Sequence, residues 1–351
     1  MYWNIKVGST KESIGHAGLN IMLYLDSQKY KPDLLIVFYS KKEAHNEIAL
    51  KTMIKHLQMN YNVKLVNSYF FSRLFRIFST RKIFRYLFKI FLADIYLAHF
   101  SDEYLGYGSP YRIWHKNSKQ ISCQLDYEVS KHFQTVKKDL GIHKKYVCVF
   151  TRDTDYYPDD DEGKFRNTDF IVLDKTITYL LNNGYQVIRV GRNHKKDNYK
   201  NNKEGYIDLE NSKVSIKPDI VDVLIIKNCE FILGSNSGLN MIAFLFNKPV
   251  LLHNYFPIGL KPIYEQGSYI CQKYMKNGEI IPYSEIPKNL LLTESVSLLK
   301  SHNISLKQNT NSEILEFVKN QINGKFKSVI RPNLKELIYG GPSGFDSNWY
   351  K

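Results

Sequence analysis

The chain has few cysteines, and their spacing excludes two common kinds of scaffold. Four occur among the 351 residues, and no two of them form a Cys-x-x-Cys pair. Neither a structural zinc site nor a disulfide framework is therefore indicated. Cys148 and Cys229 lie in apolar runs, which is typical of small core residues. The small number of cysteines and their spacing are consistent with a protein of the reducing cytoplasm.

Long hydrophobic runs are also missing. No uncharged stretch approaches the length that a membrane-spanning helix needs. The N-terminal sequence Met-Tyr-Trp-Asn-Ile-Lys-Val-Gly lacks a basic segment followed by an apolar one, so no secretion signal is visible. We therefore expect a cytoplasmic protein.

Acidic residues are outnumbered, 34 to 49, by lysine and arginine, which gives a net charge of +15. Such an excess predicts an anionic partner: a nucleotide, a nucleic acid or an acidic membrane. The 26 tyrosines and 20 phenylalanines argue against a disordered basic protein. The length allows two domains of ordinary size.

Strand-like and helix-like segments alternate along the chain. Residues 5–8 open it, and apolar strands are expected at 34–38, 63–66, 146–150, 185–190, 231–233 and 249–252, with helices at 43–57, 129–140, 171–182, 220–227 and from 239 onward. This alternation predicts an α/β fold of two Rossmann-like, doubly wound parallel-sheet domains. We place the first domain at residues 1–140 and the second at 146–310, with C-terminal helices at 311–351.

Residues 69–100 differ from the rest because aromatic and basic side chains interleave. The cations are Arg73, Arg76, Arg81, Lys82, Arg85 and Lys89, and no acidic residue occurs before Asp94. The pattern indicates an amphipathic helix or helix pair at an anionic membrane surface. A core helix with basic side chains that extend to solvent is the alternative.

A glycine-rich turn is the most informative segment. The apolar residues 231–233 lead into Gly234, Ser235, Asn236, Ser237 and Gly238, and a helical pattern follows. The glycines allow a ligand close to the backbone, and the hydroxyls and free helix N–H groups favour an anion such as phosphate. Simple capping of the helix by Ser237 or Asn236 is the alternative.

A second glycine-rich helix start surrounds His16. Gly15 and Gly18 flank it, and Asn20 follows. A histidine in this setting is a candidate general base or oxyanion ligand. A helix-cap residue on the surface is the alternative.

Two further loops follow predicted strands and carry arginines. Arg152 suits bidentate phosphate recognition, and Asp153 and Asp155 could orient it or hold substrate hydroxyls. Arg189 lies near the end of its strand, where Gly191 turns the chain. The acidic run at residues 159–162 is typical of a solvated loop, since no metal-ligand spacing accompanies it.

The segment after the strand at 249–252 carries polar and aromatic groups. His253, Asn254 and Tyr255 are candidates to recognise a base, ribose or sugar, whereas Phe256 is expected to pack in the core. All these loops would meet at one edge, because ligands bind beyond the carboxyl ends of parallel strands.

Taken together, the motifs resemble nucleotide-sugar glycosyltransferases of GT-B architecture, and more narrowly a bacterial family of predicted surface-polysaccharide glycosyltransferases. The matching pieces are Ile14-Gly-His-Ala-Gly-Leu-Asn20, Arg152 with Asp155-Tyr156-Tyr157, Arg166-Asn167, the segment 184–191, Phe231-Ile-Leu-Gly-Ser-Asn-Ser-Gly238, and Asn254-Tyr-Phe-Pro257. They span most of residues 14–258. The loop after Arg152 is unusually acidic for this family.

The resemblance implies a donor nucleotide held by the C-terminal domain, an acceptor approached from the N-terminal domain, and last helices that cross back to the first domain. The donor and phosphate ligands predicted are Arg152, Arg189, Gly191, Gly234, Ser235, Asn236, Ser237, Gly238 and Asn254. The acceptor or loop contacts predicted are Gly15, Gly18, Asn20, Asp155, Tyr156, Arg166 and Asn167.

The predicted reaction is sugar transfer from a nucleotide-sugar to a surface-glycan acceptor, which a lipid can carry. Basic side chains and helix N-termini would stabilise the leaving phosphate, so no metal or other cofactor is expected. His16 is the first choice for the catalytic base and Asp153 the second. An inverting outcome is the hypothesis, because no nucleophile for a double displacement is evident. The expected location is the inner face of the cytoplasmic membrane.

Two other classes stay open. Basic charge and many aromatics permit a nucleic-acid-binding protein, although no nucleic-acid motif is present. A membrane-surface scaffold that keeps the fold without activity is the third interpretation.

Overall fold

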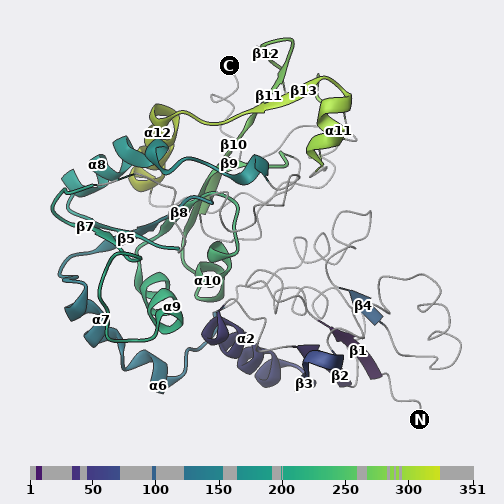
Figure 1. Ribbon diagram of the computed structural model, residues 1–351, viewed down its shortest axis with the longest axis vertical. Coiled ribbons are helices and arrows are strands. Elements are labelled where there is room, and N and C mark those ends of the chain that lie inside the picture. The colour runs from purple at the N-terminus through teal and green to yellow at the C-terminus, as the bar shows by residue number, and fades with distance from the viewer. Residues whose placement is uncertain are drawn as a thin grey trace, which may run out of the picture. The chain divides into compact units, whose positions relative to one another are not determined.

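The chain divides into two compact units, Met1–Glu128 and Val129–Lys351, in the computed structural model (Figure 1). The structure describes residues 5–9, 34–39, 46–71, 97–99, 122–152, 164–191, 199, 201–258, 267–282, 285–287, 290–291 and 295–324.

The first unit contains a parallel sheet of order β3-β2-β1-β4. Its strands are β1 (Ile5–Ser9), β2 (Leu34–Tyr39), β3 (Val63–Asn67) and β4 (Leu97–His99). Between β2 and β3 runs helix α2 (Glu47–Asn60), whose first turn is capped because the Asn46 side chain accepts a hydrogen bond from the Ala49 N–H at 2.9 Å. The predicted strands at 34–38 and 63–66 are confirmed.

The second unit is built on a six-stranded sheet of order β10-β9-β8-β5-β6-β7, in which every neighbouring pair is parallel. Its strands are β5 (Tyr146–Val149), β6 (Gln186–Arg189), β7 (Tyr206–Asp208), β8 (Ile232–Gly234), β9 (Val250–Tyr255) and β10 (Gly267–Cys271). The strands β5, β6, β8 and β9 are buried along their whole length, as expected for a parallel sheet covered on both faces.

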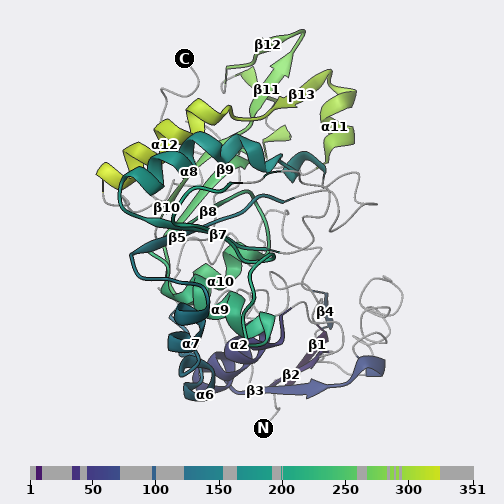
Figure 2. The same ribbon diagram turned by 60° about the vertical axis from the view of Figure 1, so that its left-hand side comes forward.

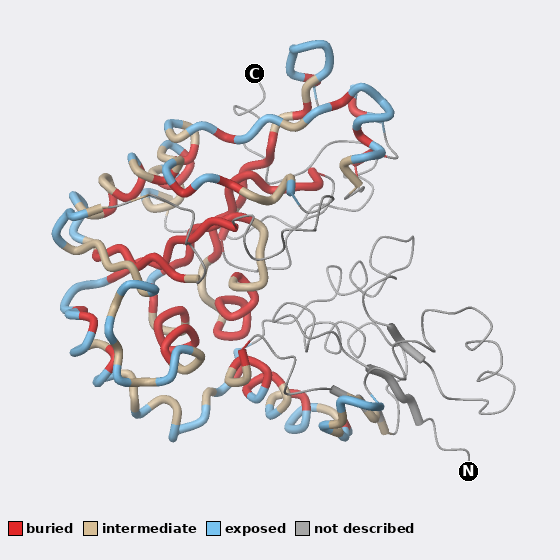
Figure 3. Tube along the Cα trace, viewed as in Figure 1, coloured by how far each residue is buried: buried red, intermediate tan, exposed pale blue. Residues whose placement is uncertain are grey.

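Helices cover both faces of this sheet. In Figures 1 and 2, α8 (Asp174–Asn182) and α12 (Asn311–Asn323) lie on one side, and α7 (Phe133–Asp139), α9 (Pro218–Asn228) and α10 (Leu239–Leu245) lie on the other. The buried tube segments in Figure 3 follow the strands and the inward faces of these helices. This arrangement confirms the predicted doubly wound α/β fold.

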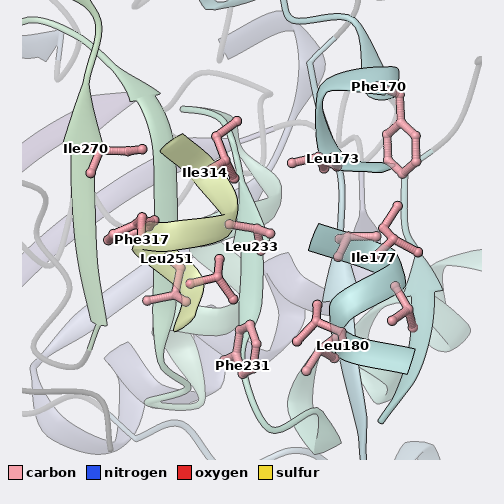
Figure 4. Close-up of a cluster of buried hydrophobic side chains, with 14 residues drawn as sticks. Phe170, Leu173, Ile177, Leu180, Phe231, Leu233, Leu251, Ile270, Ile314 and Phe317 are labelled. Atoms are coloured by element: carbon pink, nitrogen blue, oxygen red, sulfur yellow. The ribbon is translucent and has the colours of Figure 1, made fainter. Parts of the chain in front are cut away.

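A cluster of buried hydrophobic side chains lies between the sheet and the α8/α12 layer (Figure 4). Strand residues such as Val149 and Leu233 form one side of the cluster. Two helices form the other side, through Leu173 directly before α8, Ile177 in α8, and Ile314 and Phe317 in α12. A capping box fixes the start of α12, because Thr310 and Glu313 exchange side-chain to backbone hydrogen bonds. Helix α12 is thus part of the core of the second unit.

Several element boundaries differ from the predicted ones. The helix predicted at 129–140 is divided into α6 (Tyr127–Ser130) and α7, and the one at 171–182 begins with a 3-10 turn, η3 (Phe170–Leu173). The strand predicted at 249–252 continues to Tyr255, so the residues expected in a loop are strand residues. The short strands β7 and β10 were not predicted.

A small antiparallel sheet of order β12-β11-β13 was also not predicted. It consists of β11 (Lys273–Lys276), β12 (Glu279–Ile280) and β13 (Ile304–Lys307), with helix α11 (Val296–Ser301) directly before β13.

Replacement of Phe317 by alanine should destabilise the second unit by about 3–5 kcal/mol, because it removes a buried aromatic ring from the core. Glu316→Ala, at an exposed position of the same helix, should change the free energy of unfolding by less than about 0.5 kcal/mol. Denaturant unfolding of both variants measures the difference. Equal effects would show that α12 does not contribute to the core.

Candidate functional site

The strand order of the large sheet reverses next to β5. From β5 the chain continues outward through β6 and β7, and then returns to β8 on the other side of β5 and proceeds through β9 to β10. In open α/β sheets, ligands bind beyond the carboxyl ends of the strands at such a switch point. The segments that follow β5 and β8 are therefore the first candidates for a binding site.

The segment after β8 is the glycine-rich turn. A Cβ on Gly234 would lie 2.2 Å from the ring of buried Phe150, so only glycine fits there. The N-cap of α10 is Gly238, and it has no side-chain cap hydrogen bond. The capping role considered for Ser237 or Asn236 is therefore wrong. Ser237 and Gly238 are only partly buried, and α10 has 7 residues, so any anion site depends on the turn itself.

One hydrogen bond joins the two segments at the switch point. The backbone N–H of Arg152 donates to Oγ of Ser235 at 2.9 Å, and both residues are buried. The carbonyl of Ser235 in turn accepts from the amide of Asn240 in α10 at 2.9 Å. Arg152, predicted as a phosphate ligand, thus lies beside the glycine-rich turn as expected from topology.

Arg189 lies deeper than its predicted role suggests. It is buried at the end of β6, with its guanidinium carbon 3.8 Å from the centroid of the Phe170 ring. Phe170 also makes an edge contact with Tyr199, whose hydroxyl donates to Asp174 at 2.9 Å. Burial is the chief cause that raises the pKa of Tyr199 to about 12. Gly191 follows with a φ of 101°, which turns the chain after β6.

Arg166 and Asn167 lie in the segment that runs beside Arg152. Asn167 forms an isolated parallel bridge with Arg152, and the N–H of Thr168 donates to the Arg152 carbonyl at 2.9 Å. The guanidinium carbon of Arg166 is 5.6 Å from the centroid of the Phe165 ring. The structure therefore brings both residues to the same strand edge as Arg152.

Asn254 is placed at the same edge but is fully occupied by protein contacts. It is buried at the end of β9 with a φ of 51°, and its side chain bonds to Asn309 and Thr168. The buried polar residues Thr168, Gln272 and Asn309 were missed by sequence reasoning. None of them stands in a recognisable motif, so the sequence carries no signal for them.

His253 precedes Asn254 and is completely buried. Neither ring nitrogen has a hydrogen-bond partner among the described residues. Burial in this setting disfavours the charged imidazole and lowers the pKa of His253 to about 3. Tyr255 is also buried, so neither side chain is offered to solvent as a recognition group at this strand.

Several predicted site residues lie outside the described residues. These are Gly15, His16, Gly18 and Asn20 of the first glycine-rich segment, Asp153, Asp155 and Tyr156 after Arg152, and the basic residues Arg73, Arg76, Arg81, Lys82, Arg85 and Lys89.

The part of the chain that the structure describes contains neither a candidate metal cluster nor a candidate membrane span. No group of three or more His, Cys, Asp or Glu residues there could hold a metal ion. No helix in the same ranges is both long and apolar enough to cross a membrane.

Comparison with solved structures shows the fold class. The glycosyl transferase family 9 protein from Veillonella parvula DSM 2008 matches with a TM-score of 0.58 at 9% identity, over 92% of this chain and 99% of that chain. Together with the two parallel sheets, this likeness confirms a GT-B-type α/β fold.

Two structures from E. coli match with lower TM-scores. The ADP-heptose lps heptosyltransferase II has a TM-score of 0.47 at 14% identity, over 92% of this chain and 99% of that chain. The heptosyltransferase WaaC with ADP has a TM-score of 0.41 at 11% identity, over 91% and 98%. No protein-family model and no curated protein sequence matches the chain.

The buried neutral His253 should make stability depend on pH. Its pKa is about 3 when folded and about 6.5 when unfolded, so the unfolded state binds the extra proton between these values. The contribution is complete above pH 6.5 and is lost as the pH falls toward 3. Between pH 6 and 4, the wild type should lose about 1.4 kcal/mol per pH unit more than His253→Leu does.

Denaturant unfolding of the two proteins at a series of pH values measures this difference. Their slopes should coincide above pH 7. Parallel curves down to pH 4 would show that His253 is not buried in the neutral form.

Proposed function

We propose that the protein is a metal-independent, inverting glycosyltransferase that moves a sugar from a nucleotide-sugar to a bacterial surface-glycan acceptor, which a lipid can carry. The observation that supports this most is the hydrogen bond between Arg152 and Ser235. It joins an arginine and a glycine-rich turn at the switch point of a parallel sheet, where this kind of fold binds nucleotides.

Transfer from a nucleotide-sugar develops negative charge on the leaving phosphate. Arg152 carries a permanent positive charge in a planar fork of donors that matches phosphate geometry. The partly buried turn Ser237-Gly238 adds a hydroxyl and backbone N–H groups. We assign the donor diphosphate to these groups, with Gly234, Ser235 and Asn236 shaping the turn and with Arg189 and Gly191 at the neighbouring strand end.

The acceptor side is assigned to the first unit. In our proposal, His16 removes the proton from the acceptor hydroxyl, whose oxygen attacks the anomeric carbon. The bond from that carbon to the diphosphate oxygen breaks as the new glycosidic bond forms, and the configuration inverts. Asp153 is the second candidate base. Gly15, Gly18, Asn20, Asp155, Tyr156, Arg166 and Asn167 are the proposed loop and acceptor contacts.

We assign acceptor binding to the predicted domain of residues 1–140 and donor binding to the predicted domain of residues 146–310. Helix α12 packs within the second unit.

We also propose that the basic segment contacts an anionic membrane. The described residues at the start of this segment, 69–100, are Tyr69, Phe70 and Phe71, which are 43%, 66% and 44% exposed. Exposed aromatic side chains followed by six cations, with no acidic residue before Asp94, suit an interfacial segment. This would place the enzyme at the inner face of the cytoplasmic membrane, near a lipid-linked acceptor.

Arg152→Ala should weaken nucleotide binding about 10- to 100-fold, because a charged hydrogen bond to phosphate contributes about 1.5–3 kcal/mol. Ser237→Ala should have a smaller effect of about threefold to tenfold, as expected for a neutral hydrogen bond. Thermal-shift titration with ADP, UDP, GDP and CMP, and with their sugar conjugates, measures both. Lys213→Ala removes an exposed positive charge elsewhere in the unit and is the matched control.

Stabilisation of the wild type by one nucleotide would also name the donor class. Absence of any shift, or equal losses in Arg152→Ala and Lys213→Ala, would contradict the proposed donor site.

His16→Gln should lower the turnover number at least about 100-fold and leave nucleotide affinity within about twofold, because a base acts on the acceptor and not on the donor. Turnover of the nucleotide-sugar identified by the titration measures the effect, with Asp153→Asn assayed in parallel. A larger loss in Asp153→Asn than in His16→Gln would transfer the role of base to Asp153.

A further inference from the structure

A network of buried polar side chains lies at the carboxyl edge of the large sheet. Its members are Thr168, Asn254, Gln272 and Asn309, and the most exposed of them is 5% accessible. Buried polar groups destabilise a protein unless they are hydrogen-bonded, so such a cluster requires an explanation.

The centre of the network is a reciprocal pair. The N–H of Asn254 donates to Oδ1 of Asn309 at 2.7 Å, and the N–H of Asn309 donates to Oδ1 of Asn254 at 2.5 Å. The amide of Asn309 also donates to the carbonyl of Cys271 at 2.9 Å. The pair thereby ties the end of β9 to the end of β10 and to the segment that enters α12.

From Asn254 the contacts continue to the switch point. Its amide nitrogen donates to Oγ1 of Thr168 at 3.0 Å, and the N–H of Thr168 donates to the carbonyl of Arg152 at 2.9 Å. Arg152 then donates to Ser235. An unbroken path of hydrogen bonds therefore links Asn309 to the glycine-rich turn.

Gln272 closes the network on the other side. Its amide donates to the carbonyl of Phe165 at 2.6 Å and to that of Asn254 at 3.2 Å. The backbone N–H and C=O of Asn254 and both ends of its amide are thus all bonded within the protein. A side chain in this state has little capacity left for a ligand. Its φ of 51° is also one that few residues other than glycine and asparagine adopt readily.

We infer that Thr168, Asn254 and Asn309 are positioning residues, which act on the donor through Arg152 and the Gly234–Gly238 turn and do not touch it themselves. This inference rests on the proposed function of that turn. The path fixes the backbone of Arg152 from both sides, through Thr168 at its carbonyl and Ser235 at its N–H. A preorganised site binds more tightly because less order is lost on binding.

The test compares two substitutions of one side chain. Thr168→Val keeps the shape but removes the oxygen that accepts from Asn254, whereas Thr168→Ser keeps that oxygen. Thr176→Val is the matched control: Thr176 is a buried threonine of α8 whose hydroxyl has no hydrogen-bond partner among the described residues. Asn254→Gly, which preserves the positive φ, removes the centre of the network.

Two measurements are made on the full chain. Hydrogen–deuterium exchange of the free protein reports on peptides that cover residues 150–152 and 234–238, and calorimetry gives the affinity for ADP, UDP and GDP. We expect exchange in both peptides to be about threefold faster in Thr168→Val, with nucleotide affinity about threefold to tenfold weaker, the range of one lost hydrogen bond. Asn254→Gly should exceed both effects, whereas Thr168→Ser and Thr176→Val should stay within about twofold of wild type.

Unchanged exchange in Thr168→Val and Asn254→Gly would overturn the inference, as would equal acceleration in the Thr176→Val control. Faster exchange with unchanged affinity would overturn the assigned role toward the donor. If the wild type binds none of the three nucleotides, the proposed function fails and the donor role fails with it, while the exchange data still decide whether the network holds Arg152.

Discussion

The backbone of Arg152 continues past the end of β5, where its N–H must still find an acceptor. That acceptor is the hydroxyl of Ser235, which lies just past the end of β8. Both groups are buried, and a buried N–H without a partner destabilises a fold by about 1–3 kcal/mol. This bond therefore holds together the two strand ends between which the sheet reverses its order. The candidate site depends on it, because it sets the distance between the arginine and the glycine-rich turn.

The same edge shows why glycine is required at one position and not merely tolerated. The ring of Phe150 fills the space over Gly234, so the chain can leave β8 only without a side chain there. Phe150 directly follows β5 and lies two residues before Arg152, and Gly234 directly precedes Ser235. Packing and hydrogen bonding thus favour the same register between β5 and β8. The strands, and not the sequences of the loops themselves, therefore position the loops that follow.

Much of this fold could be predicted from the sequence, because buried parallel strands are short apolar runs such as residues 146–149 and 232–234. The rule that parallel strands end at the same edge then places Arg152 and the Gly234–Gly238 turn together. This prediction requires no knowledge of side-chain contacts. Arg189 shows the limit of that reasoning. Its position at a strand end was predictable, but its stacking on Phe170 depends on a 3-10 turn that the sequence presents as the start of a helix.

The polar network could not be predicted at all. Asn254 and Asn309 are 55 residues apart in the chain, and nothing in either segment indicates that the two side chains pair. Their pairing depends on the tertiary structure, because β9 extends to Tyr255 only where β10 and the segment before α12 supply partners. The local sequence pattern predicts which kinds of residue are buried. It does not predict which two polar side chains form a hydrogen-bonded pair.

The most direct test of this account is a crystal structure of the protein with the nucleotide that stabilises it. We predict that the diphosphate lies beyond the carboxyl ends of β5 and β8, with its oxygens within hydrogen-bonding distance of the Arg152 guanidinium and of Ser237 or Gly238. A diphosphate bound elsewhere, with Arg152 and the turn free of ligand, would contradict the central claim that the switch point of the second unit is the donor site.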